Sequence, residues 1–289
     1  MRVDYYNIAG CIIKVTGEES QMKPGLGVLE PFAAEPQNAD LTLHMHLVDE
    51  LDPPAGQLTF RDAGRQVYAD GERIIRYEGT LEQGLDDAYL RIERAGQQSL
   101  VQVRKSTAVE GISPKVVLRS MELTHTVTQR NALLLHASHI SYHGKAILFT
   151  APSGTGKSTQ AALWEKHEKA EVINGDRAIV KQEEAGFYAW GVPYSGSSQI
   201  SKQSCLPLGA IVYLKQAETN SIRRIAGLAA FKAIWEGCSL DTWSREDVAK
   251  LTDTVLAAAQ QAKIYLLECT PTEEAVRVLK EMLDQEMDA

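Results

Sequence analysis

The sequence has few cysteines, and none of them is close to another. The four are Cys11, Cys205, Cys238 and Cys269. Cysteines this far apart, without a CxxC pair, argue against a disulfide framework and against a zinc knuckle. The pattern favours reduced thiols, as in the cytoplasm.

Long apolar runs and an excess of positive charge are also missing. The apolar stretch LGAIVYL is too short to cross a bilayer, and the amino terminus carries Asp4 where a signal peptide has an apolar core. The formal net charge of −8 opposes binding to nucleic acid or to an anionic membrane. We therefore expect a cytoplasmic protein with no nucleic-acid or membrane partner.

Repeats and low-complexity tracts do not occur, and the composition is that of a globular protein. The length of 289 residues allows one large domain or two modest ones. Apolar residues make up 44% of the chain and charged residues 24%, which suits a protein that buries a core.

Up to about residue 110 the sequence has the alternation of β-strands, within the boundary error of such assignments. Apolar residues alternate with polar ones over 40–47, and the segments 57–77 and 88–105 predict short strands joined by turns. His44 and His46 could form a metal pair, but the alternation assigns them to the polar face of a strand.

The pattern becomes helical near Gly111. Ser113 followed by Pro114 is a typical helix start, because the serine caps the first turn and proline lacks the N–H that would be unsatisfied there. An apolar stripe that continues to Val127 predicts one helix. The fold expected is α/β, with a β-rich domain over 1–110 and a second domain, with a mixed sheet and flanking helices, over 111–289.

In the second domain a β-hairpin precedes a glycine-rich loop. Its strands are predicted over 133–141 and 145–150, and a helix follows the loop to about His167. Further strands, a Gly/Ser-rich stretch over 192–199 and a mainly helical last third complete the chain. Near its end Ser244 and Asp247 have the pattern of a capping box.

The loop over 151–158, APSGTGKS, matches the phosphate-binding pattern with alanine in place of the first glycine. Gly154 and Gly156 allow a tight turn with inward N–H groups, and the following helix adds partial positive charge. Lys157 would reach the β- and γ-phosphates, and the Ser158 hydroxyl would ligate Mg²⁺. A plain connector is the alternative, which the complete motif makes the weaker reading. The residues predicted to hold the nucleotide are Pro152, Ser153, Gly154, Thr155, Gly156, Lys157, Ser158 and Thr159.

Two further residues are candidates for the same site. Asp176 ends a predicted strand, where a carboxylate could hold Mg²⁺ or accept a proton; the alternative is a turn residue in the sequence NGD. His136 lies on the strand expected beside the one that feeds the loop, and could instead be a hydrogen-bonded core histidine. His139 and His143 are assigned to a strand and a turn.

These residues together resemble the superfamily of HPr kinase/phosphorylase and phosphoenolpyruvate carboxykinase. The resemblance is carried by LLLHAS, the hairpin, GKAILFTAPSGTGKST and INGD, and covers about residues 111–285. In both branches a histidine precedes the loop on an adjacent strand and an acidic motif follows the loop helix. His136-Ala137-Ser138 is similar to the His-Cys-Ser triplet of the carboxykinases. The stretches GVPYSGSSQ and LPLGAIVYLKQAETNSI resemble a bacterial group of HPr-kinase-like proteins, some of which are serine kinases of ribosomal peptides such as lasso-peptide precursors.

The sequence departs from this superfamily at one position that matters. The family has two adjacent aspartates, and this chain has Gly175-Asp176-Arg177. Either one carboxylate serves both metal and proton transfer, or Arg177 contacts phosphate. The Glu-Ile-Arg-Gly signature and the arginine-rich carboxykinase motifs are missing, which argues against HPr as the substrate, phosphorolysis and decarboxylation.

The resemblance and the motifs predict a P-loop kinase that moves the γ-phosphoryl group of ATP, with Mg²⁺, to a hydroxyl, and the acceptor expected is a serine of a peptide or protein. The catalytic residues would be Asp176, His136 and Lys157, and the metal ligands Ser158 and Asp176. A kinase of a sugar, nucleoside or free serine and a non-catalytic nucleotide sensor are the alternatives. The acceptor, the choice among ATP, ADP and GTP, and a homo-oligomeric state stay open. Residues 1–110 together with 192–199 could hold the acceptor, although 192–199 could equally be a connector.

Overall fold

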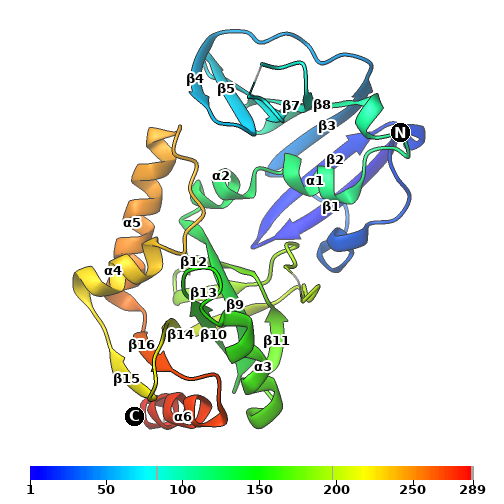
Figure 1. Cartoon of the computed structure of the whole chain (residues 1–289). Helices are drawn as coiled ribbons and strands as arrows, with labels where there is room; N and C mark the ends of the chain where they lie inside the picture. Colours follow the sequence, from blue (N-terminus) through cyan, green and yellow to red (C-terminus); the bar gives the residue numbers. More distant parts are fainter. Residues whose placement is uncertain (83, 197, 288–289) are drawn as a thin grey trace. The chain divides into compact units, whose positions relative to one another are not determined.

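The computed structural model describes residues 1–82, 84–196 and 198–287 (Figure 1). These residues form two compact units, Met1–Glu122 and Leu123–Ala289. The structure places the boundary at Glu122, whereas the sequence placed it at Gly111. The reason is that the helix after Ser113 packs within the first unit, where Arg119 and Glu122 pair with Glu78 and Arg76.

The described residues of the first unit contain one eight-stranded mixed sheet. Its order is β1-β2-β3-β8-β7-β6-β5-β4, and β3 runs parallel to both of its neighbours while the other pairs are antiparallel. The strands are β1 Arg2–Ile8, β2 Cys11–Gly17, β3 Leu41–Val48, β4 Gln57–Arg61, β5 Arg65–Asp70, β6 Arg73–Gly79, β7 Ala88–Ala95 and β8 Gln98–Arg104.

The alternation in β3 is confirmed. Leu41, Leu43 and Met45 are buried while His44 and His46 are exposed. The ring of His44 contacts the Thr16 hydroxyl at 3.0 Å and the Gln98 side chain at 2.9 Å. His44 and His46 therefore belong to the polar face of the strand.

The single helix predicted from Ser113 to Val127 is wrong, because the structure has two. α1 (Pro114–Ser120) is capped by the Ser113 hydroxyl as expected, and α2 spans Leu123–Thr128. Between them Glu122 has φ +45°, a left-handed conformation that ends a helix. Its carboxylate faces Arg76 and Arg94 at 3.5 and 3.4 Å. These partners come from elsewhere in the chain, so the local pattern could not predict the break.

In the described residues of the second unit a mixed sheet has the order β10-β9-β12-β13-β14-β16-β15, with β11 also paired to β9 and β14 to β10. β9 and β14 are long enough to have different neighbours along their length. The strands are β9 Ala132–Tyr142, β10 Lys145–Thr150, β11 Glu171–Asn174, β12 Arg177–Glu183, β13 Gly186–Trp190, β14 Cys205–Gln216, β15 Ser221–Arg224 and β16 Ile264–Cys269. The predicted hairpin before the loop is present as β9 and β10.

Helices cover both faces of this second sheet (Figure 1). One core cluster joins the strands to α4 (Gly227–Trp235) and α5 (Arg245–Gln261). The other joins them to α3 (Lys157–Glu168) and α6 (Glu273–Met287), with the buried Trp164 near Phe149 and Tyr142. Burial on both faces fixes the strands that carry the loop. No helix in the described part of the chain is long and apolar enough to span a bilayer.

Candidate active site

The glycine-rich loop connects the end of β10 to the start of α3. Gly154 has φ +80°, and Gly156, which precedes the first turn of α3, has φ +117°. Side chains with a Cβ rarely adopt this conformation, so the two glycines allow the chain to turn back sharply into the helix. The first N–H groups of an α-helix lack partners within the helix. The start of α3 therefore offers donors to an anion, as sequence reasoning expected.

Lys157 lies under the loop. Its side chain is largely buried, and Nζ donates to the carbonyl oxygens of Ala151 at 3.0 Å and Pro152 at 3.3 Å. Burial lowers the pKa of Lys157, and the nearby Asp176 carboxylate opposes this shift. The ammonium group is thus held against the loop that would surround a phosphate.

Ser158 ties the loop helix to the turn that follows β11. Its hydroxyl donates to the carbonyl oxygen of Gly175 at 3.2 Å. The Ser138 hydroxyl of β9 donates to the same oxygen at 3.1 Å. Asp176 is the next residue, so the structure brings Ser158 and Asp176 to one place.

Asn174 holds this turn, and sequence reasoning missed its role. The side chain is fully buried. Its Oδ1 accepts from the backbone N–H groups of Asp176 at 2.8 Å and Arg177 at 3.0 Å, and its Nδ2 donates to the carbonyl oxygens of Val192 and Tyr194 at 3.0 and 2.6 Å. An Asx turn in the sequence NGD was the available signal for the first pair of bonds.

Asp176 lies between a histidine and an arginine. Its Oδ1 is 3.4 Å from His136 Nε2, and its Oδ2 is 3.3 Å from Arg177 Nε. His136 and Arg177 are paired residues of β9 and β12, and the side chains of both reach the Asp176 carboxylate. Burial, and then the charge of Lys157, lower the pKa of His136, while Asp176 raises it. The balance keeps the imidazole neutral near pH 7.

The Gly/Ser-rich stretch lies against the same turn. A Cβ on Gly196 would come within 3.0 Å of the Asp176 Cβ, and one on Gly175 within 2.3 Å of the Ser198 hydroxyl. A side chain at either position would make a neighbouring side chain shift, so the two segments pack closely here. Ser197 lies outside the described residues. The stretch predicted over 192–199 is therefore a neighbour of Asp176, and its role in holding an acceptor stays a prediction.

Comparison with known families adds one decisive match. The family model described as SynChlorMet cassette protein ScmC matches residues 105–271, more than half of the chain. The chain belongs to the ScmC family. The matched range contains the loop and the turn with Asp176.

Other comparisons add little for this ScmC-family chain. No curated protein matches it. Among solved structures, the Hpr(Ser) kinase/phosphatase from Coxiella burnetii is similar over 54% of this chain and 99% of its own, with 12% sequence identity and a TM-score of 0.34. A likeness this distant says nothing about function.

A magnesium ion would suit the oxygen atoms of this ScmC-family site. Among the described residues, no group of three or more His, Cys, Asp and Glu side chains could hold a metal alone. Mg²⁺ is usually held by one or two protein oxygens together with phosphates and water. The Ser158 hydroxyl and the Asp176 carboxylate, joined through Gly175, fit that mode of binding.

His139 and His143 take no part in the site. His139 is fully buried in β9, and neither of its ring nitrogens has a hydrogen-bond partner among the described residues. Burial lowers its pKa to about 3. His143 is in the turn between β9 and β10. Both positions are those that the sequence predicted.

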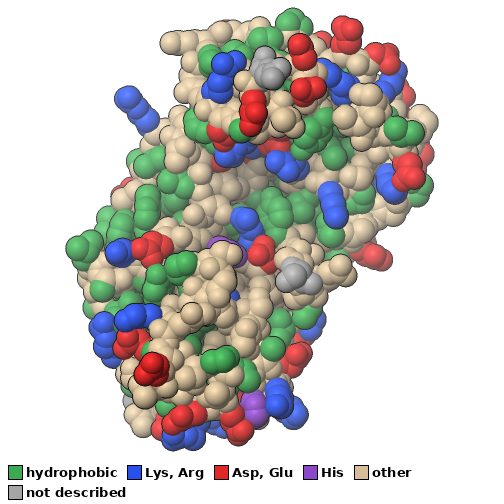
Figure 2. All heavy atoms as spheres, in the orientation of Figure 1, with side chains coloured by type: hydrophobic (Ala, Val, Ile, Leu, Met, Phe, Trp, Pro, Cys, Tyr) green, Lys and Arg blue, Asp and Glu red, His purple; other side chains and the backbone are tan. Residues whose placement is uncertain are grey.

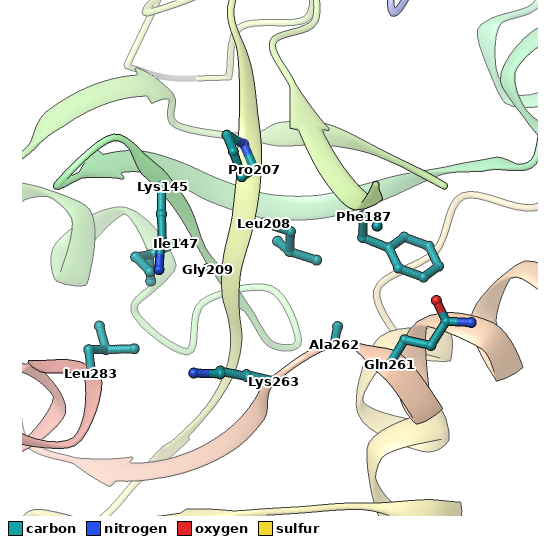
Figure 3. Close-up of a pocket in the computed structure, with 11 residues that line it drawn as sticks. Lys145, Ile147, Phe187, Pro207, Leu208, Gly209, Gln261, Ala262, Lys263 and Leu283 are labelled. Atoms are coloured by element: carbon teal, nitrogen blue, oxygen red, sulfur yellow. The ribbon is translucent and has the colours of Figure 1, made fainter. Parts of the chain in front are cut away.

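A separate cavity of about 220 Å³ lies at the other end of the parallel strands (Figure 3). It is bounded by the first residues of β10 and β14 and by the segment before β16, including Lys145, Gly209 and Lys263. The loop follows the carboxyl end of β10, where Gln216 of β14 contacts the carbonyl oxygens of Gly154 and Thr155. The cavity thus lies away from the glycine-rich loop. On the visible face of the molecule, acidic and basic side chains are interspersed (Figure 2).

Proposed function

We propose that this chain is an ATP- and Mg²⁺-dependent kinase that transfers the γ-phosphoryl group to a hydroxyl, with a serine of a peptide or protein as the acceptor. One observation carries the proposal. The loop with the phosphate-binding pattern is joined, through the Ser158 hydroxyl and the Gly175 carbonyl oxygen, to the turn that holds Asp176. A phosphate-binding device and a carboxylate are the two parts that phosphoryl transfer needs.

The loop would bind the triphosphate. The backbone N–H groups of residues 152–159 would face the phosphate oxygens, and the start of α3 would add positive charge. Lys157 would exchange its two carbonyl partners for the β- and γ-phosphates. Mg²⁺, held by Ser158 and Asp176, would neutralise charge on the phosphates.

Asp176 would accept the proton of the attacking hydroxyl. The acceptor oxygen forms its bond to the γ-phosphorus as the bond to the bridging oxygen of the β-phosphate breaks, and ADP carries that electron pair away. His136, neutral at pH 7, would hold one carboxylate oxygen in place through its Nε2 contact. Positioning and electrostatics would supply most of the rate.

The hairpin before the loop supports a domain of the HPr kinase and carboxykinase type. His136 is on β9, which runs antiparallel to the strand that feeds the loop, as the histidine does in that superfamily. The peptide acceptor rests on the sequence resemblance to peptide-modifying members. A small hydroxyl compound is the alternative acceptor.

A nucleotide sensor without catalysis is the second candidate, and the pairing of Asp176 with Arg177 favours it. A carboxylate that already faces a guanidinium at 3.3 Å is less available to an incoming hydroxyl than an unpaired one. Measurement of nucleotide binding beside turnover separates the sensor from the kinase.

The test of the kinase uses the full chain with MgATP. Lys157→Ala should abolish turnover while the chain stays folded, and Lys166→Ala, on the exposed side of α3, should not change it. Asp176→Asn should lower turnover by about 10² or more, the scale of losing a general base, and should weaken nucleotide binding far less. Turnover by Lys157→Ala at the wild-type rate would show that the reaction takes place at another site.

The acceptor is tested by transfer of labelled phosphate from MgATP. Serine peptides, the same peptides with alanine in place of serine, sugars, nucleosides and free serine are compared. Label on the serine peptides alone supports the peptide kinase. Label on a small compound alone would show that the acceptor is that compound and not a peptide, and the proposed kinase activity would be retained.

A further inference from the structure

Arg177 occupies the position where the resembling superfamily has a second aspartate, and its backbone is firmly fixed. It is the first residue of β12 and pairs with His136. Its N–H donates to the buried Asn174 side chain at 3.0 Å. The start of its side chain is therefore placed beside the Asp176 carboxylate by the sheet itself.

The guanidinium group is held from three directions. Nε faces Asp176 Oδ2 at 3.3 Å, Nη1 donates to the Ser239 hydroxyl at 2.8 Å, and the group lies over the Tyr194 ring, 5.2 Å from its centroid. The side chain is 34% exposed. A long side chain that is oriented in this way, but still reachable, has lost much of its conformational freedom before a ligand arrives.

A simple ion pair with Asp176 does not explain this arrangement. A guanidinium that serves a carboxylate usually presents two parallel N–H groups to it. Here the contact is a single one, through Nε. The remaining N–H groups on Nη1 and Nη2 have no partner in the residues that the structure describes.

The charges around Arg177 favour an anion as a ligand of its guanidinium group. Arg177 faces the Asp176 carboxylate at 3.3 Å, and Lys157 lies near the same carboxylate. These two cations and one carboxylate together carry one net positive charge. Ser158, which contacts the carbonyl oxygen just before Asp176, connects this point to the loop.

We propose that Arg177 is a further catalytic residue, which donates hydrogen bonds to the phosphoryl group while it is transferred. This inference rests on the proposed function. The planar guanidinium would face the oxygens of that group as they separate from ADP, where charge has to be stabilised. Arg177 would exchange no proton, because arginine stays charged. Tyr194 and Ser239 would be positioning residues for it.

The first experiment measures hydrolysis of MgATP by the full chain, with water as the acceptor. Arg177→Ala should lower kcat by about 10² to 10³, the usual loss for one donor to a developing oxyanion, with the Kd for MgADP unchanged. Free guanidinium should restore part of the rate. Arg177→Lys should stay slow, because a lysine cannot keep both the Ser239 contact and the flat face over Tyr194. Arg277→Ala, which alters an exposed arginine of α6, is the matched control and should behave as the wild type.

A second measurement tests the contact without turnover. The wild-type chain should bind MgADP with aluminium fluoride, a mimic of the transferred group, more tightly than MgADP alone, and Arg177→Ala should lose that difference. Tyr194→Leu should lose most of it, whereas Tyr194→Phe, which keeps the ring face, should retain it.

The outcomes separate the two proposals. Suppose that the wild-type chain hydrolyses MgATP, and that Arg177→Ala does so equally fast and binds MgADP with aluminium fluoride equally tightly. That result overturns this inference but not the proposed kinase activity. A wild-type chain that neither binds nor hydrolyses MgATP overturns both. If Arg177→Ala fails to bind MgADP at all, the comparison of Tyr194→Leu with Tyr194→Phe decides. Equal affinities of these two variants for MgADP with aluminium fluoride would overturn the role of Arg177.

Discussion

Asn174 is a small residue with a large structural effect, because its amide group satisfies four backbone groups. Asn174→Ala would take the amide oxygen away from the N–H groups of Asp176 and Arg177, and one donor away from the carbonyl oxygens of Val192 and Tyr194. Each buried polar group left unsatisfied costs about 1–3 kcal/mol. We expect the free energy of unfolding to fall by at least about 2 kcal/mol, measured by urea denaturation. An Asn174→Ala chain as stable as the wild type would show that water replaces the amide.

The same residue shows what a sequence can and cannot predict. The bonds from Asn174 to Asp176 and Arg177 are local, so the pattern NGD contains them. The bonds to Val192 and Tyr194 form only because the segment that contains these two residues folds back against Asn174, and no local pattern specifies them. Lys157 and Ser158 were predictable because the loop is contiguous. The predicted hairpin could place His136 near the loop, but its contact with Asp176 depends on the pairing of β9 with β12, which no local pattern specifies.

His139 predicts a dependence of stability on pH. Its pKa is about 3 in the folded chain against 6.5 for an ordinary histidine. Between these values the unfolded chain binds a proton that the folded chain excludes, so stability is complete above pH 6.5 and falls as the pH drops. The slope from this one group is about 1.4 kcal/mol per pH unit.

The measurement compares wild type with His139→Leu by urea denaturation between pH 4 and pH 7, a range set around the ordinary histidine pKa. Carboxylates contribute to both curves, so the difference between the two chains isolates His139. The stability of the variant should decline less steeply toward acid. Parallel curves would contradict the prediction.

Between elements, the start of α5 differs from the capping box that the sequence indicated. Ser244 does accept a hydrogen bond from the Asp247 N–H at 3.1 Å. The Asp247 carboxylate, however, faces His125 Nδ1 at 2.8 Å and accepts from Gln129 at 2.6 Å, both on the α2 side of the unit. The box pattern is local, whereas α2 reaches Asp247 only in the folded chain.

This geometry predicts unequal effects of two alanine substitutions. Ser244→Ala should lower the free energy of unfolding by about 1 kcal/mol, as for other caps. Asp247→Ala should lower it by about 2–3 kcal/mol, since the half-buried His125 and Gln129 both lose hydrogen bonds to a charged group. Denaturant unfolding of both variants gives the comparison. Equal losses of unfolding free energy in the two variants would show that Asp247 contributes only to the cap.

For the whole molecule, the two compact units predict that the second one folds alone. Residues 123–289 contain their own sheet and both of its helix layers. The isolated segment should give a cooperative unfolding transition and bind MgATP, because the loop, Lys157 and Ser158 remain. It should hydrolyse ATP slowly and lose transfer to the acceptor of the full chain. Full transfer by the segment would leave residues 1–122 a structural or oligomerising role.

The Gly175 carbonyl oxygen accepts from two hydroxyls, those of Ser138 and Ser158. Only Ser158 belongs to the loop that would take a nucleotide and its metal. If that hydroxyl turned to a metal ion, the Ser138 hydroxyl would still donate to the oxygen. The turn would then keep its shape when a nucleotide binds and leaves, and little of the binding free energy would be spent on rebuilding it. Ser138 would thus keep the Gly175 carbonyl oxygen hydrogen-bonded whether or not Ser158 donates to it.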